Sequence, residues 1–465
     1  MNYHSRYAAV ARPVETCVLG GGAFGRSFVA QARFIAKMGA RIVVDLTAEA
    51  AGEALVAAGW PAADVRLCRT AGEAQAAWQG GQAVAADRLE TVIDLPFECL
   101  VEATGHPEAA ARHALMAIEA RRHVLMVTKE TDSVAGPYLA QRARARGVGM
   151  TPVDGDQPSL LIDLVTWGET LGFTIHAAGK SSEYDFVFDR ASGRVASNGR
   201  PADLPLLEQF WAPGGRTLPE VCTGRARILA QAYPLKAVPD LCEMTLVANA
   251  TGLVADVPGF HAPVARIPEV ADLLAPQAAG GLLSGTGRLD VFHHLRAPDE
   301  ASFAGGVFIV VGCQDRDSWA ILAEKGHVVS RSGETAMIYL PRHLLGLEAA
   351  TSVLDLVGLG QSAYGADYRP RTDLVAVASA NLPAGTELTA KGHHHTIDGV
   401  TAEMRPMQAL AADATTPYYL VANRRLTRAV QAGAAIRLSD LEIDEGSVLL
   451  GLRREQDRAF ARPDA

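Results

Sequence analysis

The chain has 465 residues, which is enough for about three domains with full hydrophobic cores. Apolar residues make up 49% and charged residues 20%, so a mainly disordered or fibrous chain is excluded. The formal net charge of −9 argues against nucleic acid as a partner.

The first residues contain no apolar core of the kind that a signal peptide requires. The longest uncharged apolar stretches, such as Phe303–Cys313, fall short of the roughly 20 residues that cross a bilayer. We therefore expect a cytoplasmic protein with no membrane contact. The six cysteines are scattered and form no Cys-x-x-Cys pair, so we expect neither a disulfide framework nor a bound metal. The triplet His393-His394-His395 is interpreted as a turn.

Short β-rich runs alternate with longer amphipathic segments up to about Thr151, which predicts a doubly wound parallel sheet of the Rossmann type. The first strand is expected at Thr16–Leu19. A helix over Phe24–Met38 follows and is expected to end near Gly39. A second strand over Arg41–Val44 leads into Asp45.

The later elements of this part continue the alternation. They are helices over Ala48–Ala58 and Pro107–Arg121, strands over Cys99–Ala103 and Val124–Val127, and a last helix and strand between Val134 and Thr151.

The pattern changes after Thr151. A helix over Pro158–Thr170, capped from Asp154-Gly155-Asp156, opens a mixed region that predicts an α+β domain for substrate binding and oligomerisation. Other elements expected there are β-like runs at Gly172–Ala177, Gly306–Val311 and Ala336–Leu340 and a helix at Leu241–Ala250. The segment Gly358–Arg371 is typical of a linker, and short apolar runs beyond it predict a small all-β module. The predicted domains are 1–153, 154–368 and 369–465.

The glycines of residues 20–25 satisfy the pattern G-x-G-x-x-G between a predicted strand and a predicted helix. Such glycines allow a tight turn, close approach of a pyrophosphate and close packing of the helix. Asp45 lies where a carboxylate accepts hydrogen bonds from a ribose 2′-hydroxyl and would repel a 2′-phosphate. We predict a dinucleotide site with NAD favoured and NADP as the alternative; a purely structural glycine turn is the competing interpretation. The residues predicted to form the dinucleotide site are Gly20, Gly22, Ala23, Phe24, Gly25 and Asp45.

Glu102-Ala103-Thr104-Gly105 ends the predicted strand at Cys99–Ala103, and ligands of open α/β sheets lie beyond the carboxyl ends of strands. We predict that Thr104 and Gly105 lie beside the cofactor. An ordinary strand-to-helix turn is the alternative.

The chain has only six lysines among 43 basic residues. A lysine at a predicted strand end is a candidate acid/base, because a buried ammonium can lose its proton whereas a guanidinium cannot. Lys180 and Lys129 occupy such positions, and a surface or ion-paired lysine is the alternative for each. His343 is either a site residue or a core group.

Three segments of the first part resemble the nucleotide-binding domain of homoserine dehydrogenases and related oxidoreductases: residues 20–25, Val101–Gly105 and Thr128–Glu130. Asp154–Ser159, Ala248–Leu253 and His343–Glu348 resemble the homoserine-dehydrogenase-like proteins that end in a SAF domain. The segments Ala384-Gly385-Thr386, Ala432-Gly433 and Ser439-Asp440-Leu441 are similar to the SAF signature, which implies a β-clip fold. The resemblance covers nearly the whole chain.

The resemblance implies hydride transfer between a nicotinamide and a carbinol or carbonyl carbon, with a lysine as general acid/base. Lys180 is the first candidate and Lys129 the second; Glu183, Asp185, Glu243 and His343 are candidates for holding the lysine or the substrate. Homoserine and aspartate semialdehyde are the first substrate pair. The usual Asp-Pro and Asp-Ala-Ala signature of homoserine dehydrogenases is absent, however.

Two alternatives stay open. One branch of this group resembles a 1-deoxy-D-xylulose-5-phosphate reductoisomerase, which would require an arginine-rich anion pocket and a divalent metal if it works like ordinary enzymes of that activity. The other alternative is a non-catalytic sensor that only binds NAD. A homo-oligomer acting on a small polar substrate is expected.

Overall fold

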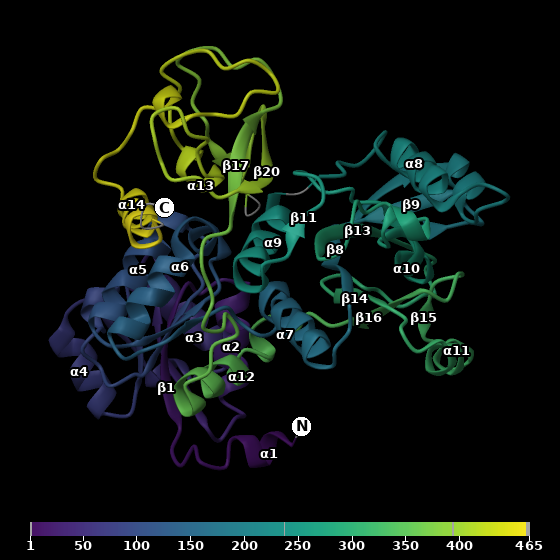
Figure 1. The fold of residues 1–465 in the computed structure, drawn as a ribbon. Coiled ribbons are helices and arrows are strands. Elements are labelled where there is room, and N and C mark those ends of the chain that lie inside the picture. The colour runs from purple at the N-terminus through teal and green to yellow at the C-terminus, as the bar shows by residue number, and fades with distance from the viewer. Residues whose placement is uncertain (1, 237, 393–394, 462–465) are drawn as a thin grey trace.

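The computed structural model describes residues 2–236, 238–392 and 395–461. Figure 1 shows three parts: an N-terminal part in purple and blue, a middle part in teal and green, and a C-terminal part in yellow-green. His393 and His394 lie outside the described residues. Among the described residues we find no helix with the length and apolar character that a membrane crossing requires.

The first part is a seven-stranded sheet in the order β3-β4-β2-β1-β5-β6-β7, and every pair of neighbours is parallel. The central strands are buried on both faces, as sheets covered by helices on both sides require. The predicted doubly wound parallel sheet is thus confirmed. The strands are β1 (Val14–Leu19), β2 (Met38–Val44), β3 (Val65–Cys68), β4 (Ala83–Ala86), β5 (Cys99–Glu102), β6 (His123–Met126) and β7 (Met150–Thr151).

The order of the strands reverses at β1, which pairs with β2 on one side and with β5 on the other. Beyond the carboxyl ends of these strands lies the crevice in which such sheets bind ligands. The helices of this part are α1 (Tyr3–Arg6), α2 (Ala23–Ala32), α3 (Ala48–Ala57), α4 (Ala71–Gln79), α5 (Pro107–Glu119) and α6 (Lys129–Ala145).

The end predicted for the first long helix is wrong. Helix α2 stops at Ala32, six residues before Met38, and Gly39 lies inside β2 rather than at a helix end. The reason is the register of the parallel sheet, in which Val14 pairs with Met38 and so brings that residue into the strand. Helix α6 begins at Lys129, five residues earlier than the predicted Val134.

The middle part is a mixed nine-stranded sheet with helices. The long strand β8 runs parallel to β13 and antiparallel to β14. The strands are β8 (Ile175–Asp189), β9 (Arg194–Ser197), β10 (Arg200–Asp203), β11 (Val254–Ala255), β12 (Val264–Ala265), β13 (Arg288–Arg296), β14 (Val307–Gly312), β15 (Val328–Val329) and β16 (Thr335–Leu340). The helices are α7 (Gln157–Thr170), α8 (Leu218–Leu229), α9 (Val238–Thr251), α10 (Val270–Leu273) and α11 (Arg316–Glu324). Helix α12 (Ala350–Val353) comes later in the chain and packs into the core of the first part, beside α2 in Figure 1. Helices α7 and α9 lie side by side where the middle part meets the first (Figure 1).

The C-terminal part contains two pairs of antiparallel strands joined by long irregular segments. They are β17 (Thr372–Ala378), which pairs with β20 (Val400–Pro406), and β18 (Ala390–Lys391), which pairs with β19 (Thr396–Ile397). A short helix, α13 (Tyr418–Val421), lies among them. Asn249 of α9 fastens this part to the middle part, because its Oδ1 accepts the backbone N–H groups of Arg371 at 2.8 Å and Thr372 at 2.9 Å.

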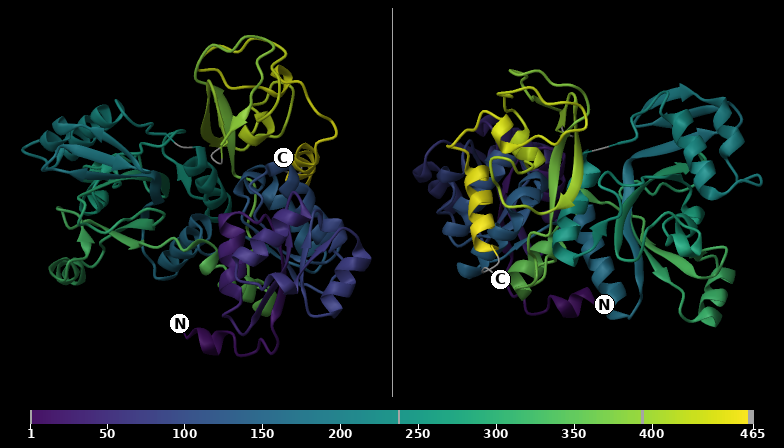
Figure 2. Two further views of the ribbon diagram at one scale, coloured as in Figure 1. Left: turned by 180° about the vertical axis from the view of Figure 1, so that it is seen from behind. Right: turned by 45° about the horizontal axis from the view of Figure 1, so that its top comes forward.

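The C-terminal tail, for which no element was predicted, forms α14 (Val448–Ala459) and returns to the first part. In both views of Figure 2 this yellow helix lies against the blue helices, and it packs on α5 and α6. Glu108 of α5 accepts the N–H of Val448 at 2.6 Å and the hydroxyl of Ser447 at 2.7 Å, so it caps the first turn. The guanidinium of Arg453, on the same helix, pairs with Asp373 of β17 at 2.6 Å.

Gln456 of α14 forms hydrogen bonds with the backbone of α6 beside Pro137. Pro137 lies inside α6, where a proline distorts the hydrogen-bond ladder. The Gln456 amide donates to the carbonyl of Val134 at 3.0 Å and accepts the N–H of Tyr138 at 3.3 Å. It therefore joins the two backbone groups that an undistorted helix would bond directly.

Candidate functional site

The glycine loop after β1 has the shape that a dinucleotide requires. Gly20 has φ of +96°, and a Cβ there would lie 2.4 Å from the carbonyl oxygen of Ala103. A Cβ on Gly25 would lie 2.0 Å from the carbonyl oxygen of Gly20, so the helix approaches the strand as closely as glycine allows. A Cβ on Gly22 would meet no atom within 4 Å, so the loop is open at this residue.

The first turn of α2 is prepared for an anion. Gly22 is the N-cap, no side chain caps the helix, and the first turn holds no acidic residue. The N–H groups of Ala23 and Phe24 belong to this turn and have no acceptor within the helix. A helix N-terminus of this kind attracts phosphate through these N–H groups and through its partial positive charge.

Asp45 lies beside this loop at the carboxyl end of β2. Its Oδ2 accepts the N–H of Gly21 at 2.7 Å and its Oδ1 accepts the N–H of Leu46 at 2.7 Å. The carboxylate is therefore held in place next to the crevice, in the position from which a ribose hydroxyl is bound in such folds.

The loops after β5 and β6 are tied together by the buried carboxylate of Glu102. It accepts the hydroxyl of Thr104 at 2.7 Å and also the hydroxyl of Thr128. The N–H of Gly105, whose φ is +68°, donates to the Thr128 hydroxyl at 3.0 Å. This network fixes the start of α6, and so the residue that follows Thr128, at the carboxyl edge of the sheet.

That residue, Lys129, meets Lys180 through a shared carboxylate. One oxygen of Glu243, Oε1, contacts Lys129 Nζ, and the other, Oε2, contacts Lys180 Nζ. Lys129 Nζ also lies 3.0 Å from Asp156 Oδ2. Lys180 Nζ lies 2.9 Å from Asp240 Oδ1 and 3.3 Å from Glu183 Oε1. We call these six residues the lysine–carboxylate cluster.

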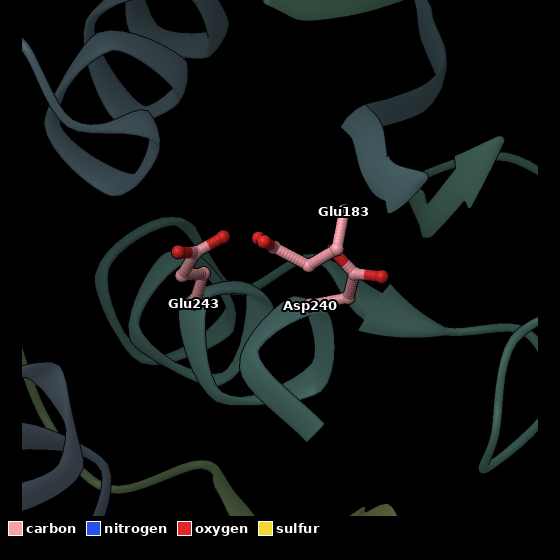
Figure 3. A group of neighbouring side chains, drawn as sticks. All are labelled: Glu183, Asp240 and Glu243. Atoms are coloured by element: carbon pink, nitrogen blue, oxygen red, sulfur yellow. The ribbon is translucent and has the colours of Figure 1, made fainter. Parts of the chain in front are cut away.

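The residues of the cluster come from α6, the N-cap of α7, β8 and α9. Asp240 and Glu243 are three residues apart on one face of α9, and Glu183 comes from β8; Figure 3 shows the three carboxylates gathered there. Asp156 is the N-cap of α7 and accepts the N–H of Gln157 at 2.9 Å. Asp156 and Asp240 were not predicted from the sequence as site residues. Asp156 was interpreted as part of a helix cap. Asp240 could have been identified from its spacing of three residues from Glu243, which places both on one helix face.

The two lysines differ in exposure. The side chain of Lys180 is 0% exposed, whereas that of Lys129 is 22% exposed. Burial acts to lower the pKa of each lysine, but the surrounding carboxylates outweigh it and raise both pKa values, so both amines are protonated.

The carboxylates of the cluster do not titrate alike. Burial acts to raise the pKa of Glu243, but Lys129 and Lys180 lower it to about 2. Burial raises the pKa of Asp240 to about 6, although Lys180 opposes the shift. With all groups ionised, four carboxylates face two ammonium groups, which leaves an excess of two negative charges.

The Lys180 ammonium occupies the place that a cation would take among Glu183, Asp240 and Glu243. One oxygen from each of these carboxylates lies within 4.8 Å of the others, a spacing at which three carboxylates could hold a metal ion. The ammonium contacts all three of them. A metal ion bound there would have to displace it.

The remaining predicted residues are divided by the structure. His343 lies at the edge of the cluster, with Nε2 3.8 Å from Asp156 Oδ1. The same segment touches the glycine helix, because the N–H of Gly346 donates to the Ser27 hydroxyl at 3.1 Å. Asp185 belongs to another network, with Arg296 at 3.0 Å and His294 at 3.2 Å, so the structure gives its predicted site role no support.

The C-terminal part also reaches the edge of the cluster. His395 Nε2 lies 3.7 Å from Oε1 of Glu130, the neighbour of Lys129. Burial raises the pKa of Glu130 to about 7, although the Lys129 ammonium opposes the shift. A carboxyl group that titrates near neutral pH thus lies next to the partly exposed lysine.

Comparison with known protein families gives one match, to the family described as oxidoreductase DRL, catalytic domain, over residues 238–349. This segment contains Asp240, Glu243 and His343. Half of the carboxylates of the cluster therefore lie in a region with the sequence features of an oxidoreductase catalytic domain. A search of curated proteins returned no match.

Solved structures with similar folds include a homoserine dehydrogenase from Thiobacillus denitrificans, which is 14% identical with a TM-score of 0.36, and 81% of this chain and 84% of that chain are covered. GenD2 from gentamicin A biosynthesis, in complex with NAD, is 16% identical with a TM-score of 0.33, covering 76% and 88%. The WlbA dehydrogenase from Bordetella pertussis, in complex with NADH and UDP-GlcNAcA, is 16% identical with a TM-score of 0.27, covering 37% and 48%, so the chain spans about half its length. At such scores, the assignment of function rests on the geometry of the site.

Proposed function

We propose that the chain is an NAD-dependent oxidoreductase that transfers a hydride between a nicotinamide and a small polar hydroxy or carbonyl compound. The observation that carries this proposal is the position of Lys129. Its ammonium lies at the carboxyl edge of the parallel sheet, one residue after Thr128, which binds the loop of Thr104 and Gly105. At this edge of the sheet a proton donor would lie near the crevice in which this kind of sheet holds a dinucleotide, which supports the proposal.

The glycine loop fits the cofactor. The open backbone at Gly22 and the uncapped amides of Ala23 and Phe24 would hold the pyrophosphate, and Asp45 would bind the ribose hydroxyls. A carboxylate at this place repels a 2′-phosphate, which favours NAD over NADP. When bound, the nicotinamide supplies or accepts the hydride.

We assign the acid/base role to Lys129 and a positioning role to Lys180. Lys129 is partly exposed and protonated, so it can donate to the oxygen of a carbonyl group while the carbon is reduced, and it takes the proton back in the reverse reaction. Lys180 is enclosed and makes contacts with three carboxylates, so its ammonium orients Glu243 rather than touching the substrate.

The charge of the site favours a substrate with an amino group. The excess of two negative charges in the cluster attracts an ammonium group and repels a phosphate. We therefore keep homoserine and aspartate semialdehyde as the first substrate pair. Separately, we propose that the chain forms a homo-oligomer.

A sugar-phosphate reductoisomerase acting on 1-deoxy-D-xylulose 5-phosphate is the second candidate. The grouping of Glu183, Asp240 and Glu243 favours it, because three carboxylate oxygens at this spacing suit a divalent metal once Lys180 has moved aside.

The test is absorbance at the reduced-nicotinamide band, with NAD or NADP and a panel of homoserine, other hydroxy amino acids and polyols. The reducing direction is measured with NADH or NADPH and 1-deoxy-D-xylulose 5-phosphate, with and without Mg²⁺. Reduction of NAD by a hydroxy amino acid is the expected result. Metal-dependent activity on the sugar phosphate alone would establish the second candidate. Tight NAD binding without turnover on any compound of the panel would favour an untested substrate or a sensor.

A further inference from the structure

The contacts of the cluster form an unbroken line from solvent to Lys129. Glu183 Oε1 lies 3.3 Å from Lys180 Nζ, Lys180 Nζ contacts Glu243 Oε2, and Glu243 Oε1 contacts Lys129 Nζ. Carboxylates and ammonium groups alternate along this line. Each link is therefore an N–H group that donates to a carboxylate oxygen.

The residues at the two ends of the line are partly exposed to solvent, and the two residues between them are buried. The side chain of Glu183 is 27% exposed and that of Lys129 is 22% exposed, whereas those of Lys180 and Glu243 are 0% and 2% exposed. Asp240, the other carboxylate at Lys180, is 4% exposed and accepts the hydroxyl of Ser182 at 2.6 Å. Among these carboxylates, Glu183 thus gives Lys180 its contact with water.

We propose that Glu183, Lys180 and Glu243 form a relay that returns a proton from solvent to Lys129 during turnover. This inference rests on the proposed function. In carbonyl reduction a hydride adds to the carbon, the C=O π bond breaks, and the oxygen takes one proton from the Lys129 ammonium. The neutral amine then takes a proton from Lys180 through Glu243, and Lys180 takes one from water through Glu183. The net change is the uptake of one solvent proton for each hydride.

The relay explains why a carboxylate binds two ammonium groups with separate oxygens. If Lys129 acts as proposed, the bound substrate and cofactor would cover its exposed part during the reaction and keep water from that amine. A second entrance at Glu183 on β8, on the far side of Lys180, leaves the way to the proton donor open.

The first test needs neither cofactor nor substrate. Because the chain has only six lysines, ¹⁵N-lysine labelling of the full chain gives few ammonium signals, and the exchange of the Lys180 Nζ hydrogens with water can be followed by NMR. We expect Glu183→Gln to slow this exchange about tenfold or more, since an amide accepts the hydrogen bond but does not carry the proton. The Lys129 signal stays at its wild-type shift, because Glu183 does not touch it, which separates a proton path from a structural effect.

Glu208→Gln is the matched control, because Glu208 pairs with Arg190 at the surface and does not touch the cluster. Equal Lys180 exchange in wild type and Glu183→Gln would overturn the relay. For a wild type that turns over, Glu183→Gln is expected to lower kcat for reduction about tenfold at unchanged KM, and an unchanged kcat would also overturn it. A wild type with no turnover at all contradicts the proposed function, and the exchange experiment still decides the relay.

Discussion

Lys180 Nζ lies 2.9 Å from Asp240 Oδ1, and neither side chain has more than slight contact with solvent. Lys180 and Asp240 therefore hold each other in a place where neither could stay charged alone. Lys129, which shares Glu243 with this pair, has the exposure that Lys180 lacks. This difference makes Lys129 the lysine whose loss should abolish chemistry.

Lys129→Ala is expected to lower turnover by about 10²–10⁴-fold, the usual range for a lost general acid/base. NAD binding, measured by calorimetry, should remain, because the glycine loop is untouched. Lys325→Ala is the control, as this lysine follows α11, away from the cluster. A fall in turnover of less than tenfold would contradict the role of Lys129.

Glu243→Gln is expected to destabilise the protein by about 3–5 kcal/mol at pH 7, because it leaves two ammonium groups without their shared carboxylate. The pKa of Glu243 in the folded protein is about 2, below the unfolded value of 4.5. The stability that this carboxylate gives is therefore complete above pH 4.5 and is lost as the pH falls toward 2. Urea unfolding of both proteins at pH 7, 5 and 3.5 should show the difference narrowing at the lowest pH.

Glu130→Gln should have the opposite pH dependence. The pKa of Glu130 is about 7 in the folded protein and 4.5 unfolded, so the folded state binds more protons between these values. The stability of the wild type should thus fall, relative to Glu130→Gln, as the pH rises from 4.5 to 7, and the difference should be constant above that. Urea unfolding at pH 5, 6, 7 and 8 measures it, and a difference that does not change with pH would show that Glu130 ionises normally.

Asp45→Ala is expected to weaken NAD binding by about 10–100-fold, as for lost hydrogen bonds to a charged group, and to bring NADP binding closer to that of NAD. Calorimetric titration with each cofactor gives both constants. An unchanged ratio of the NAD and NADP constants would remove Asp45 from the ribose site.

Gln456→Leu tests the hydrogen bonds between Gln456 and α6. The change leaves the carbonyl of Val134 and the N–H of Tyr138 without their partner, which is expected to cost about 1–3 kcal/mol. Hydrogen exchange over 134–138 should increase at the same time. Glu455→Gln, at an exposed neighbour, serves as the control for α14; equal protection of 134–138 in both variants would contradict the role of these hydrogen bonds.

The sequence predicted the first part well because its signals are local. A strand, a glycine loop and an amphipathic helix follow one another within residues 14–32, and each can be recognised without the rest of the fold. The end of α2 could not be predicted in this way, because Met38 enters the sheet through pairing with Val14 across 24 positions. The domain limits at 153 and 368 stay predictions.

The site was predicted as separate residues rather than as a cluster. Lys129, Lys180 and Glu243 could each be named from strand ends and local acidity, but the sharing of Glu243 by the two lysines depends on contacts between residues 114 and 63 positions apart. Asp185 shows the limit of local acidity as a signal: it lies on the same strand as Lys180 and Glu183, and its side chain pairs with Arg296 instead.

The hydrogen bonds between Gln456 and α6 also join two segments that the ribosome makes at different times. Val134 and Gln456 are 322 positions apart, so a ribosome adding about 5–20 residues per second makes the second roughly 15–60 s after the first. During that interval α6 lacks the two hydrogen bonds that Gln456 makes beside Pro137. The parallel-sheet part of the chain is therefore translated first, and its helix α6 gains these contacts only after α14 has been made.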